Sequence, residues 1–419
     1  MNIDLSWRRF VELPYRLCFA LATALWVLSS VFWCASCLGV GAFLGPGQGL
    51  VHLQLFGLGV MPLFFGGFLM TAGARWLHVA SPRARAWAPP VVALFGGWLL
   101  TLGAQLTPWP LLWAAGLLLS ALGWIGVEVQ LVRLRNIARP GQQSAMHFDL
   151  ACAALGVLTV SLLASGAFVA LQRFDLARLA SLSGLWLGVV PVFIIASDRM
   201  LPFFNQPVPL PWLRSRERAV YRLALAACVA LALQPWVSFW TSSWPSSWTA
   251  GPTGVLTRGV WPAVQLAAAA VFVVHAAAQR EVATRSNDLL RMLLRAFRCW
   301  SLAWVTFGVA SWPGLGAAVR QRLDMAAIHV LTLGFLGGTL IAMVGRVIAT
   351  QAGRSVAIDR FSKGLELVLW LTLALRLAAQ WPGVAAPAWI AAAATAWMAL
   401  SLGWAWRHLP MLFAFKAPR

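Results

Sequence analysis

The chain has few charged residues, few acids and only six histidines. Charged side chains make up 11% of its 419 residues, whereas water-soluble globular proteins carry roughly 25%. Apolar residues reach 60%, and the mean hydropathy is +0.76. So little polar surface cannot cover a soluble body of this size, which excludes both a soluble enzyme and a disordered chain.

Acidic residues are the scarcest charged class, with 12 Asp and Glu against 32 Lys and Arg, so the formal net charge is +20. Only Lys363 and Lys416 are lysines, and the other cations are arginines. In a soluble protein this balance would indicate nucleic acid binding. Here the arginines lie in short runs between long apolar stretches, as in polytopic membrane proteins. We therefore expect the lipid bilayer, and no nucleic acid, as partner.

Twelve apolar stretches are long enough to cross a bilayer as helices, which need about 20 residues each. They are 15–40, 50–73, 88–106, 109–132, 148–171, 177–200, 219–240, 256–278, 293–312, 325–348, 364–381 and 386–407. No connection between them is long enough for a soluble domain. The sequence thus predicts an all-α polytopic bundle of about 12 transmembrane helices, forming a single transmembrane domain over 1–419.

The distribution of arginine predicts the orientation of this bundle. With a cytoplasmic N-terminus, the loops on the outer side hold only Arg173, Arg178, Arg258, Arg320 and Arg322, and most other cations lie inside. We therefore expect cytoplasmic N- and C-termini. The first run, 15–40, is too long for the apolar core of a signal peptide, so we expect it to be a retained helix.

Two histidines occupy matching places in the predicted bundle. His52 and His329 each open a helix expected to run from the outer to the inner face, and a glycine follows each after five residues. Facing helices of a bundle are where haem and metal ligands are usually built. We expect these two imidazoles to ligate one iron from both sides. The alternative is that each hydrogen-bonds to a neighbouring helix.

Residues around His329 extend this hypothesis. Gly334 and Gly338 have the spacing that lets a flat ligand or another helix approach the backbone closely. Arg320 and Arg322 precede the histidine by nine and seven residues. If the helix begins that early, Arg322 stands about 10 Å further toward water, within reach of a haem propionate. Otherwise both are ordinary loop charges.

A copper site is predicted from the one close pair of cysteines. Cys34 and Cys37 share a helix face near the end of the first span, and soft thiolates favour Cu(I). Met325, four residues before His329 and on its face, adds a thioether sulfur. The alternative is that the cysteines act as small apolar residues.

Within the predicted spans, four charged residues stand out because they lie in apolar surroundings: Glu128, Arg346, Glu366 and Arg376. Charged residues inside a bilayer usually face the bundle interior and pair with one another. A structural role in ion pairs is therefore one reading, and a proton path is the other.

Residues 328–354, IHVLTLGFLGGTLIAMVGRVIATQAGR, resemble the tenth helix of the NnrS family. The family's pattern also resembles HLQLFG at 52–57, GGFLMTA at 66–72 and Trp76. Further matches, in the family's order, are Pro14, Tyr15, Arg16, Phe19, Arg199, Pro202, Phe203, Phe204, Ala303 and Trp304. The resemblance thus recurs along nearly the whole chain.

This resemblance implies a bacterial inner-membrane protein with twelve spans that contains haem, here expected as haem b, and copper, and that acts in resistance to nitric oxide and nitrosative stress. Only His52 and His329 are carried over as family-pattern histidines. Four positions that are polar in the family differ here: Leu50, Leu53, Cys299 and Gln351. These differences predict a divergent member that keeps one haem and has lost a second metal, or that binds none.

Two other functions agree with the same bundle: a secondary transporter, and a non-catalytic membrane partner of a respiratory complex. Against a transporter, the second and third spans are joined without the Gly-Asp-Arg-rich motif of the major facilitator class, and paired broken helices are not evident. Nitric oxide or another small molecule is the expected ligand. The sequence leaves open whether a reaction is catalysed, the electron donor and the oligomeric state.

Overall fold

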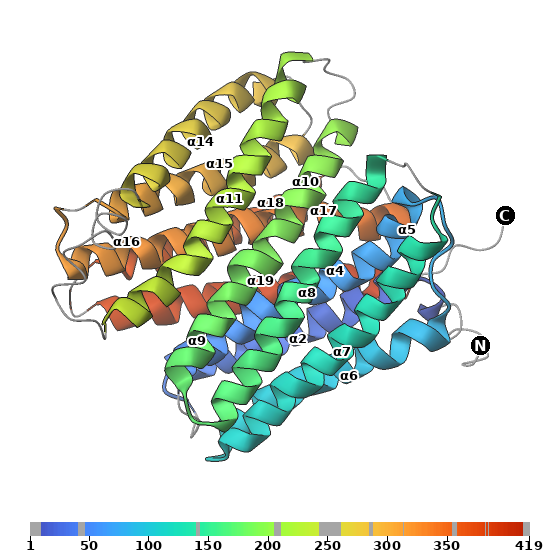
Figure 1. Ribbon diagram of the computed structural model, residues 1–419, viewed down its shortest axis with the longest axis horizontal. Helices are drawn as coiled ribbons and strands as arrows, with labels where there is room; N and C mark the ends of the chain where they lie inside the picture. The colour runs from blue at the N-terminus through green and yellow to red at the C-terminus, as the bar shows by residue number, and fades with distance from the viewer. Residues whose placement is uncertain are drawn as a thin grey trace. The chain divides into compact units, whose positions relative to one another are not determined.

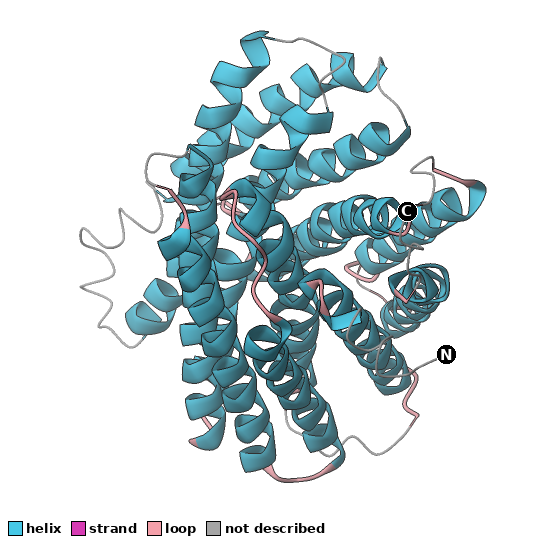
Figure 2. Ribbon diagram, turned by 90° about the vertical axis from the view of Figure 1, so that its right-hand side faces the viewer, coloured by secondary structure: helices cyan, strands magenta, loops and turns pink. Residues whose placement is uncertain are grey.

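The structure, a computed structural model, describes residues 10–40, 47–139, 143–204, 211–242, 261–284, 288–312, 314–353, 358–381, 383 and 385–413. Arg258, named above, and Arg354, the last residue of the segment 328–354, lie outside these ranges. Every regular element in the described part of the chain is a helix (Figure 2). The predicted all-α class is therefore confirmed.

Contacts divide the chain into two compact units. The first comprises Met1–Ala196, Ile348–Arg354 and Ser401–Arg419. Its elements are α2 (Pro14–Cys37), α3 (Gln48–His52), η1 (Leu53–Val60), α4 (Met61–Phe68), η2 (Leu69–Gly73), α5 (Ala74–Trp76), α6 (Ala84–Gly103), η3 (Ala104–Leu106), α7 (Pro110–Ile137), α8 (Gln143–Ala170), α9 (Phe174–Ser183), η4 (Gly184–Val189) and the start of α10 (Val190–Phe204).

Small residues set the closest packing in the first unit. Helices α6 and α7 lie side by side (Figure 1). A Cβ on Gly97 would lie 2.5 Å from the Gly116 carbonyl oxygen, and one on Gly116 would lie 2.7 Å from the Gly97 carbonyl oxygen. The two backbones therefore touch where neither residue has a side chain, which is a common device in membrane helix pairs.

The second unit comprises Ser197–Val347 and Ser355–Leu400. Its elements are α11 (Pro211–Ser242), α14 (Trp261–Thr284), α15 (Asp288–Ala310), α16 (Ala317–His329), η6 (Val330–Gly337), most of α17 (Gly338–Gln351), α18 (Arg360–Ala378) and the first part of α19 (Ala386–Leu412). Helix α15 contacts α14, α16 and η6, and α18 contacts α16 and η6. The segment that carries His329 is thus packed between α15 and α18.

In the described part of the chain, nine helices are long and apolar enough to cross a membrane. They are Pro14–Cys37, Gln48–Trp76, Ala84–Leu106, Pro110–Ile137, Ala145–Ala170, Phe174–Ser197, Arg222–Trp240, Ala317–Gln351 and Ala386–Leu412. Each coincides with one of the predicted spans. Helices also occupy the other three predicted stretches, namely α14, α15 and α18. The chain is therefore a helical membrane protein.

Candidate functional site

Both candidate histidines stand immediately before a π-helical segment. His52 is the last residue of α3, and η1 follows with eight residues in π-helical geometry. His329 is the last residue of α16, and η6 follows with eight residues in the same geometry. π-helical turns are rare and are frequently found at functional sites. The matching sequence contexts of the two histidines therefore correspond to matching backbone structure.

His52 lies among aromatic rings in the first unit. Its half-buried imidazole is 4.1 Å from the Trp33 ring and 5.0 Å from the Phe56 ring, measured between centroids. The Ser36 hydroxyl of α2 donates to the Gln48 side-chain oxygen of α3 at 2.9 Å. The last turn of α2 thus lies along α3 and covers the histidine.

The two predicted copper-binding cysteines lie in that same last turn of α2. Cys34 is buried, Cys37 is half-buried, and both are free thiols. Helical spacing places Cys37 on the face that carries Trp33 and Ser36, toward α3. However, no three His, Cys, Asp or Glu side chains within the described ranges gather as a metal site requires. Cys34, Cys37 and His52 therefore do not form a three-ligand site by themselves.

His329 is held by hydrogen bonds on both ring nitrogens in the second unit. Its Nδ1 is 2.8 Å from the Met325 carbonyl oxygen, and its Nε2 is 3.2 Å from Arg376 Nε. Because a carbonyl only accepts and a guanidinium only donates, Nδ1 carries the proton and Nε2 accepts from Arg376. Met325, predicted to offer its sulfur, thus contributes its backbone carbonyl to this arrangement.

The hydrogen bonds of His329 are compatible with a metal ligand, provided that one of them is broken. Metal-bound histidines almost always donate their other N–H to a carboxylate, a backbone carbonyl or water, as His329 does toward Met325. The nitrogen left for a metal is Nε2, whose lone pair accepts from Arg376. His329 can therefore take an iron only when Arg376 moves aside.

The helix that carries His329 begins before Arg320 and Arg322, so both arginines belong to it, as a role at the site of His329 requires. Ala317–Gln351 is one 35-residue helix, about 52 Å long, whereas the hydrocarbon core is about 30 Å thick. This helix is therefore longer than the core, and residues 317–322 at its start are all exposed and include Arg320 and Arg322. Arg322 lies two turns before His329 on nearly the same face, and Arg320 lies on the opposite face. Only Arg322 therefore shares a face with the histidine.

The glycines after His329 receive a neighbouring helix. A Cβ on Gly334 would lie 2.7 Å from Cys299 Cβ, and one on Gly338 would lie 2.9 Å from Ala296 Cβ. Both partners belong to α15. Of the two expected occupants of this face, the structure thus has a helix rather than a flat ligand.

Three other positions that differ from the family pattern, Leu50, Leu53 and Gln351, lie in apolar surroundings or at a helix end. Leu50 is buried in α3, and Leu53 begins η1 with its side chain against Gly57. Gln351 is the half-buried last residue of α17. These residues and Cys299 add no metal-binding cluster in the described part of the chain.

A buried polar network beside His52 was not predicted. The Gln54 amide, within η1, donates to the Ser165 hydroxyl at 2.8 Å and to the Ser181 hydroxyl at 3.2 Å, and its oxygen accepts from Trp113 Nε1 at 2.9 Å. All these side chains are almost completely buried. The network joins η1 to α7, α8 and α9. A glutamine inside an apolar run was the available signal.

Replacing Gln54 by leucine is expected to destabilise the first unit by about 1–2 kcal/mol, because the Trp113 N–H loses its acceptor inside the bundle. Thr23→Val is the matched control. Its hydroxyl is equally buried but bonds only to Phe19 of its own helix. Reversible unfolding in detergent and denaturant measures both changes. Equal stabilities for the two variants would contradict a role for the network.

Glu128 and Glu366, the two acids considered within the predicted spans, both accept hydrogen bonds. The Thr159 hydroxyl donates to Glu128, and Glu366 accepts two bonds of 2.7 Å from Arg295 and one of 3.2 Å from Trp370. These contacts give Glu366 a structural ion pair, although its partner is Arg295 and not another of the four charges considered above.

The sequence model of the family described as NnrS protein matches residues 9–416, nearly the entire chain. No curated protein matches the chain. Because the match covers far more than half of its length, this chain belongs to the NnrS family.

Proposed function

We propose that this NnrS-family protein binds haem b through His52 and His329 and acts in resistance to nitric oxide in the bacterial inner membrane. The observation that carries the proposal is the matching position of the two histidines, each directly before an eight-residue π-helical segment. They belong to different units, and their joint ligation of one iron is part of the proposal.

The side chains around the two histidines support a cofactor role. Trp33 and Phe56 flank His52 with apolar rings, which suits a porphyrin edge. The Met325 carbonyl fixes the tautomer of His329 that leaves Nε2 for a metal. When bound, a haem would supply an iron that binds nitric oxide directly. These residues would hold the haem and limit the access of water.

The proposed topology has twelve spans with both termini in the cytoplasm. Helices α14, α15 and α18, of 24, 23 and 19 residues, occupy the three spans beyond the nine apolar helices. The Lys363 ammonium at the start of α18 lies 2.9 Å from Asp288 at the start of α15. Because these two starts share one side, the chain between them crosses the membrane twice. This supports a topology in which α15 crosses the membrane in one direction and Ala317–Gln351 crosses it in the other.

We also propose that Cys34 and Cys37 bind Cu(I) as a thiolate pair. Their common helix face and their neighbourhood to α3 support this site. Among the residues described, no group of three or more His, Cys, Asp or Glu side chains gathers around these thiols, so the proposed site has two protein ligands.

Arg322→Ala is expected to weaken haem retention about fivefold, since its guanidinium shares the face of His329 and can pair with a propionate. Arg320→Ala, on the opposite face, is the matched control and is expected to change little. Haem per protein after prolonged dialysis against apomyoglobin measures both. Unchanged haem content in the double variant would exclude both arginines from the site.

Arg376→Leu is expected to have the opposite effect and to tighten haem binding about tenfold. Loss of its bond to His329 Nε2 removes a charged donor that competes with iron, an interaction of about 1.5–3 kcal/mol. Titration of the haem-free protein with haem gives the affinity, with Arg178→Leu as an exposed control. Weaker binding in Arg376→Leu would mean that this arginine holds the haem instead.

Survival of cells under a nitric oxide donor tests the proposed function. Cells lacking this chain should be sensitive, the wild-type chain should restore growth, and His329→Ala should not. The purified wild-type protein should also show a Soret band that shifts when nitric oxide is added. A folded, colourless protein that leaves survival unchanged would overturn the proposal and favour a transporter or a partner subunit.

A further inference from the structure

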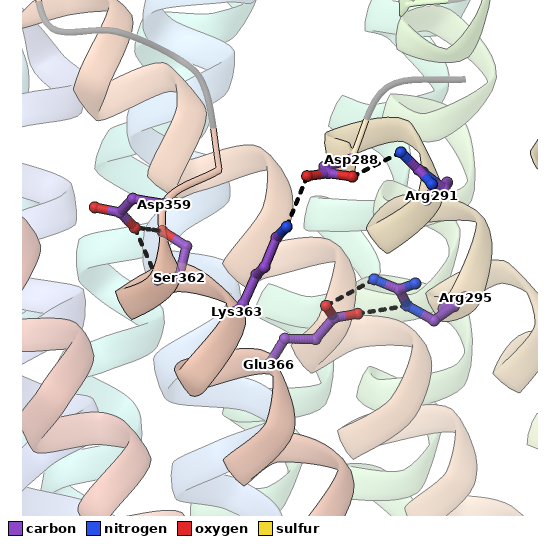
Figure 3. Close-up of polar contacts among 7 residues, drawn as sticks. All are labelled: Asp288, Arg291, Arg295, Asp359, Ser362, Lys363 and Glu366. Carbon is purple, nitrogen blue, oxygen red and sulfur yellow. Dashed lines mark hydrogen bonds and ion pairs between the residues drawn. The ribbon is translucent and has the colours of Figure 1, made fainter. Parts of the chain in front are cut away.

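The starts of α15 and α18 are joined by a cluster of ion pairs (Figure 3). Asp288 lies 2.9 Å from the Lys363 ammonium and 2.7 Å from Arg291 Nη2. Glu366, buried one turn further along α18, accepts two bonds from Arg295. The two helix starts are thereby fixed at the same level.

One exposed stripe runs along α15 and changes character midway. Its first part holds Arg291, Arg295 and Arg298, at i, i+4 and i+7, and all three are exposed. The same face continues with Leu302 and Val309, which are 51% and 45% exposed. The change from cationic to apolar within one turn is the pattern expected where a helix passes from the headgroup layer into hydrocarbon.

The cationic part of the stripe is not neutralised by its own acids. The starts of the two helices hold the cations Arg291, Arg295, Arg298, Arg360 and Lys363 and the acids Asp288, Asp359 and Glu366, which leaves a charge of 5 − 3 = +2. Within the described ranges, no carboxylate forms an ion pair with Arg298. Arg298 is also the arginine of the stripe nearest to the apolar part. An anion at headgroup depth would balance this charge.

We propose that this face of α15 binds an anionic phospholipid. Arg298 would hold the phosphate, together with the donors that Arg291 and Arg295 do not use in their ion pairs. Planar guanidinium groups suit phosphate because they offer two parallel N–H donors. An acyl chain would then lie along Leu302 and Val309. The site is independent of haem and does not use His52 or His329.

Native mass spectrometry of the purified protein with phosphatidylglycerol tests the site. Wild-type protein should retain phosphatidylglycerol in preference to phosphatidylcholine, and Arg298→Gln should weaken this binding about fivefold. Arg178→Gln is the matched control, since it removes an arginine that is also exposed, in this case from α9. Because Arg298 is exposed, its variant should fold, and an unchanged thermal unfolding midpoint in phosphatidylcholine checks this.

Three results would overturn the proposal. Arg298→Gln could bind phosphatidylglycerol as tightly as the wild type. Inorganic phosphate could raise the thermal unfolding midpoint as much as phosphatidylglycerol does, which would indicate a site for the free ion. The variant could instead change the oligomeric state and leave lipid binding unchanged, which would indicate that a second copy of the chain covers this face.

Discussion

Arg295→Leu is expected to destabilise the second unit by about 3 kcal/mol, the largest effect on stability that we predict for a single substitution. The two bonds of 2.7 Å from Arg295 to Glu366 neutralise a carboxylate whose side chain is only 9% exposed. Without Arg295, Glu366 keeps only the bond from Trp370. Removing one partner of a buried ion pair leaves an uncompensated charge, which is strongly destabilising.

The two partners of this pair are expected to respond unequally. Arg295 is 45% exposed, so after Glu366→Leu its guanidinium can be hydrated, and the loss should be about 1 kcal/mol. The double variant Arg295→Leu/Glu366→Leu should recover most of the stability lost in Arg295→Leu. Unfolding of all four proteins in the same detergent gives the cycle. Equal losses in the two single variants would contradict the burial of Glu366.

His329→Ala and His52→Ala are each expected to lower the haem content of the purified protein at least tenfold. Each substitution removes an iron ligand in the proposed site, and loss of even an outer partner of a ligand costs about 10–100-fold in metal affinity. The substitutions should leave the bundle folded, because both imidazoles are only half-buried.

His78→Asn is the matched control for the two ligand variants. His78 is exposed outside the spans, and its backbone has a positive φ of 53°, which asparagine tolerates. Pyridine haemochrome analysis gives haem per chain for all three variants. Full haem content in either ligand variant would exclude that histidine from the site, and loss of haem in His78→Asn would point to unspecific destabilisation.

The helical architecture could be predicted from hydropathy because each membrane helix must bury its own backbone polar groups. In the described part of the chain, a helix occupies each of the twelve apolar stretches, and nine of these helices are long and apolar enough to cross a membrane. Arg295 and Arg298 are unusual within an apolar stretch such as 293–312. The structure explains them, since Arg295 and Arg298 lie on its exposed face and Arg295 pairs with α18.

The surroundings of the candidate site could be predicted only in part. The shared spacing from His52 to Gly57 and from His329 to Gly334 pointed to two equivalent places, and both are followed by π-helical segments. The π geometry itself has no hydropathy signal. The partner of His329 is Arg376, 47 residues away, and such a contact depends on how α16 and α18 pack.

The long-range polar contacts of Gln54 likewise depend on how the helices pack. Gln54 reaches Ser165 and Ser181, 111 and 127 residues further along the chain, and no pattern in one sequence relates these positions. In the structure α15 packs against Gly334, whereas the sequence was compatible with either a helix or a flat ligand at this position.

The visible and electron paramagnetic resonance spectra of the purified wild-type protein test the central claim most directly, because two imidazoles on one iron give a low-spin ferric haem. We predict one low-spin haem per chain, which becomes high-spin or is lost in both His52→Ala and His329→Ala. A folded wild-type protein without a Soret band, or a haem whose spin state neither substitution changes, would contradict the account.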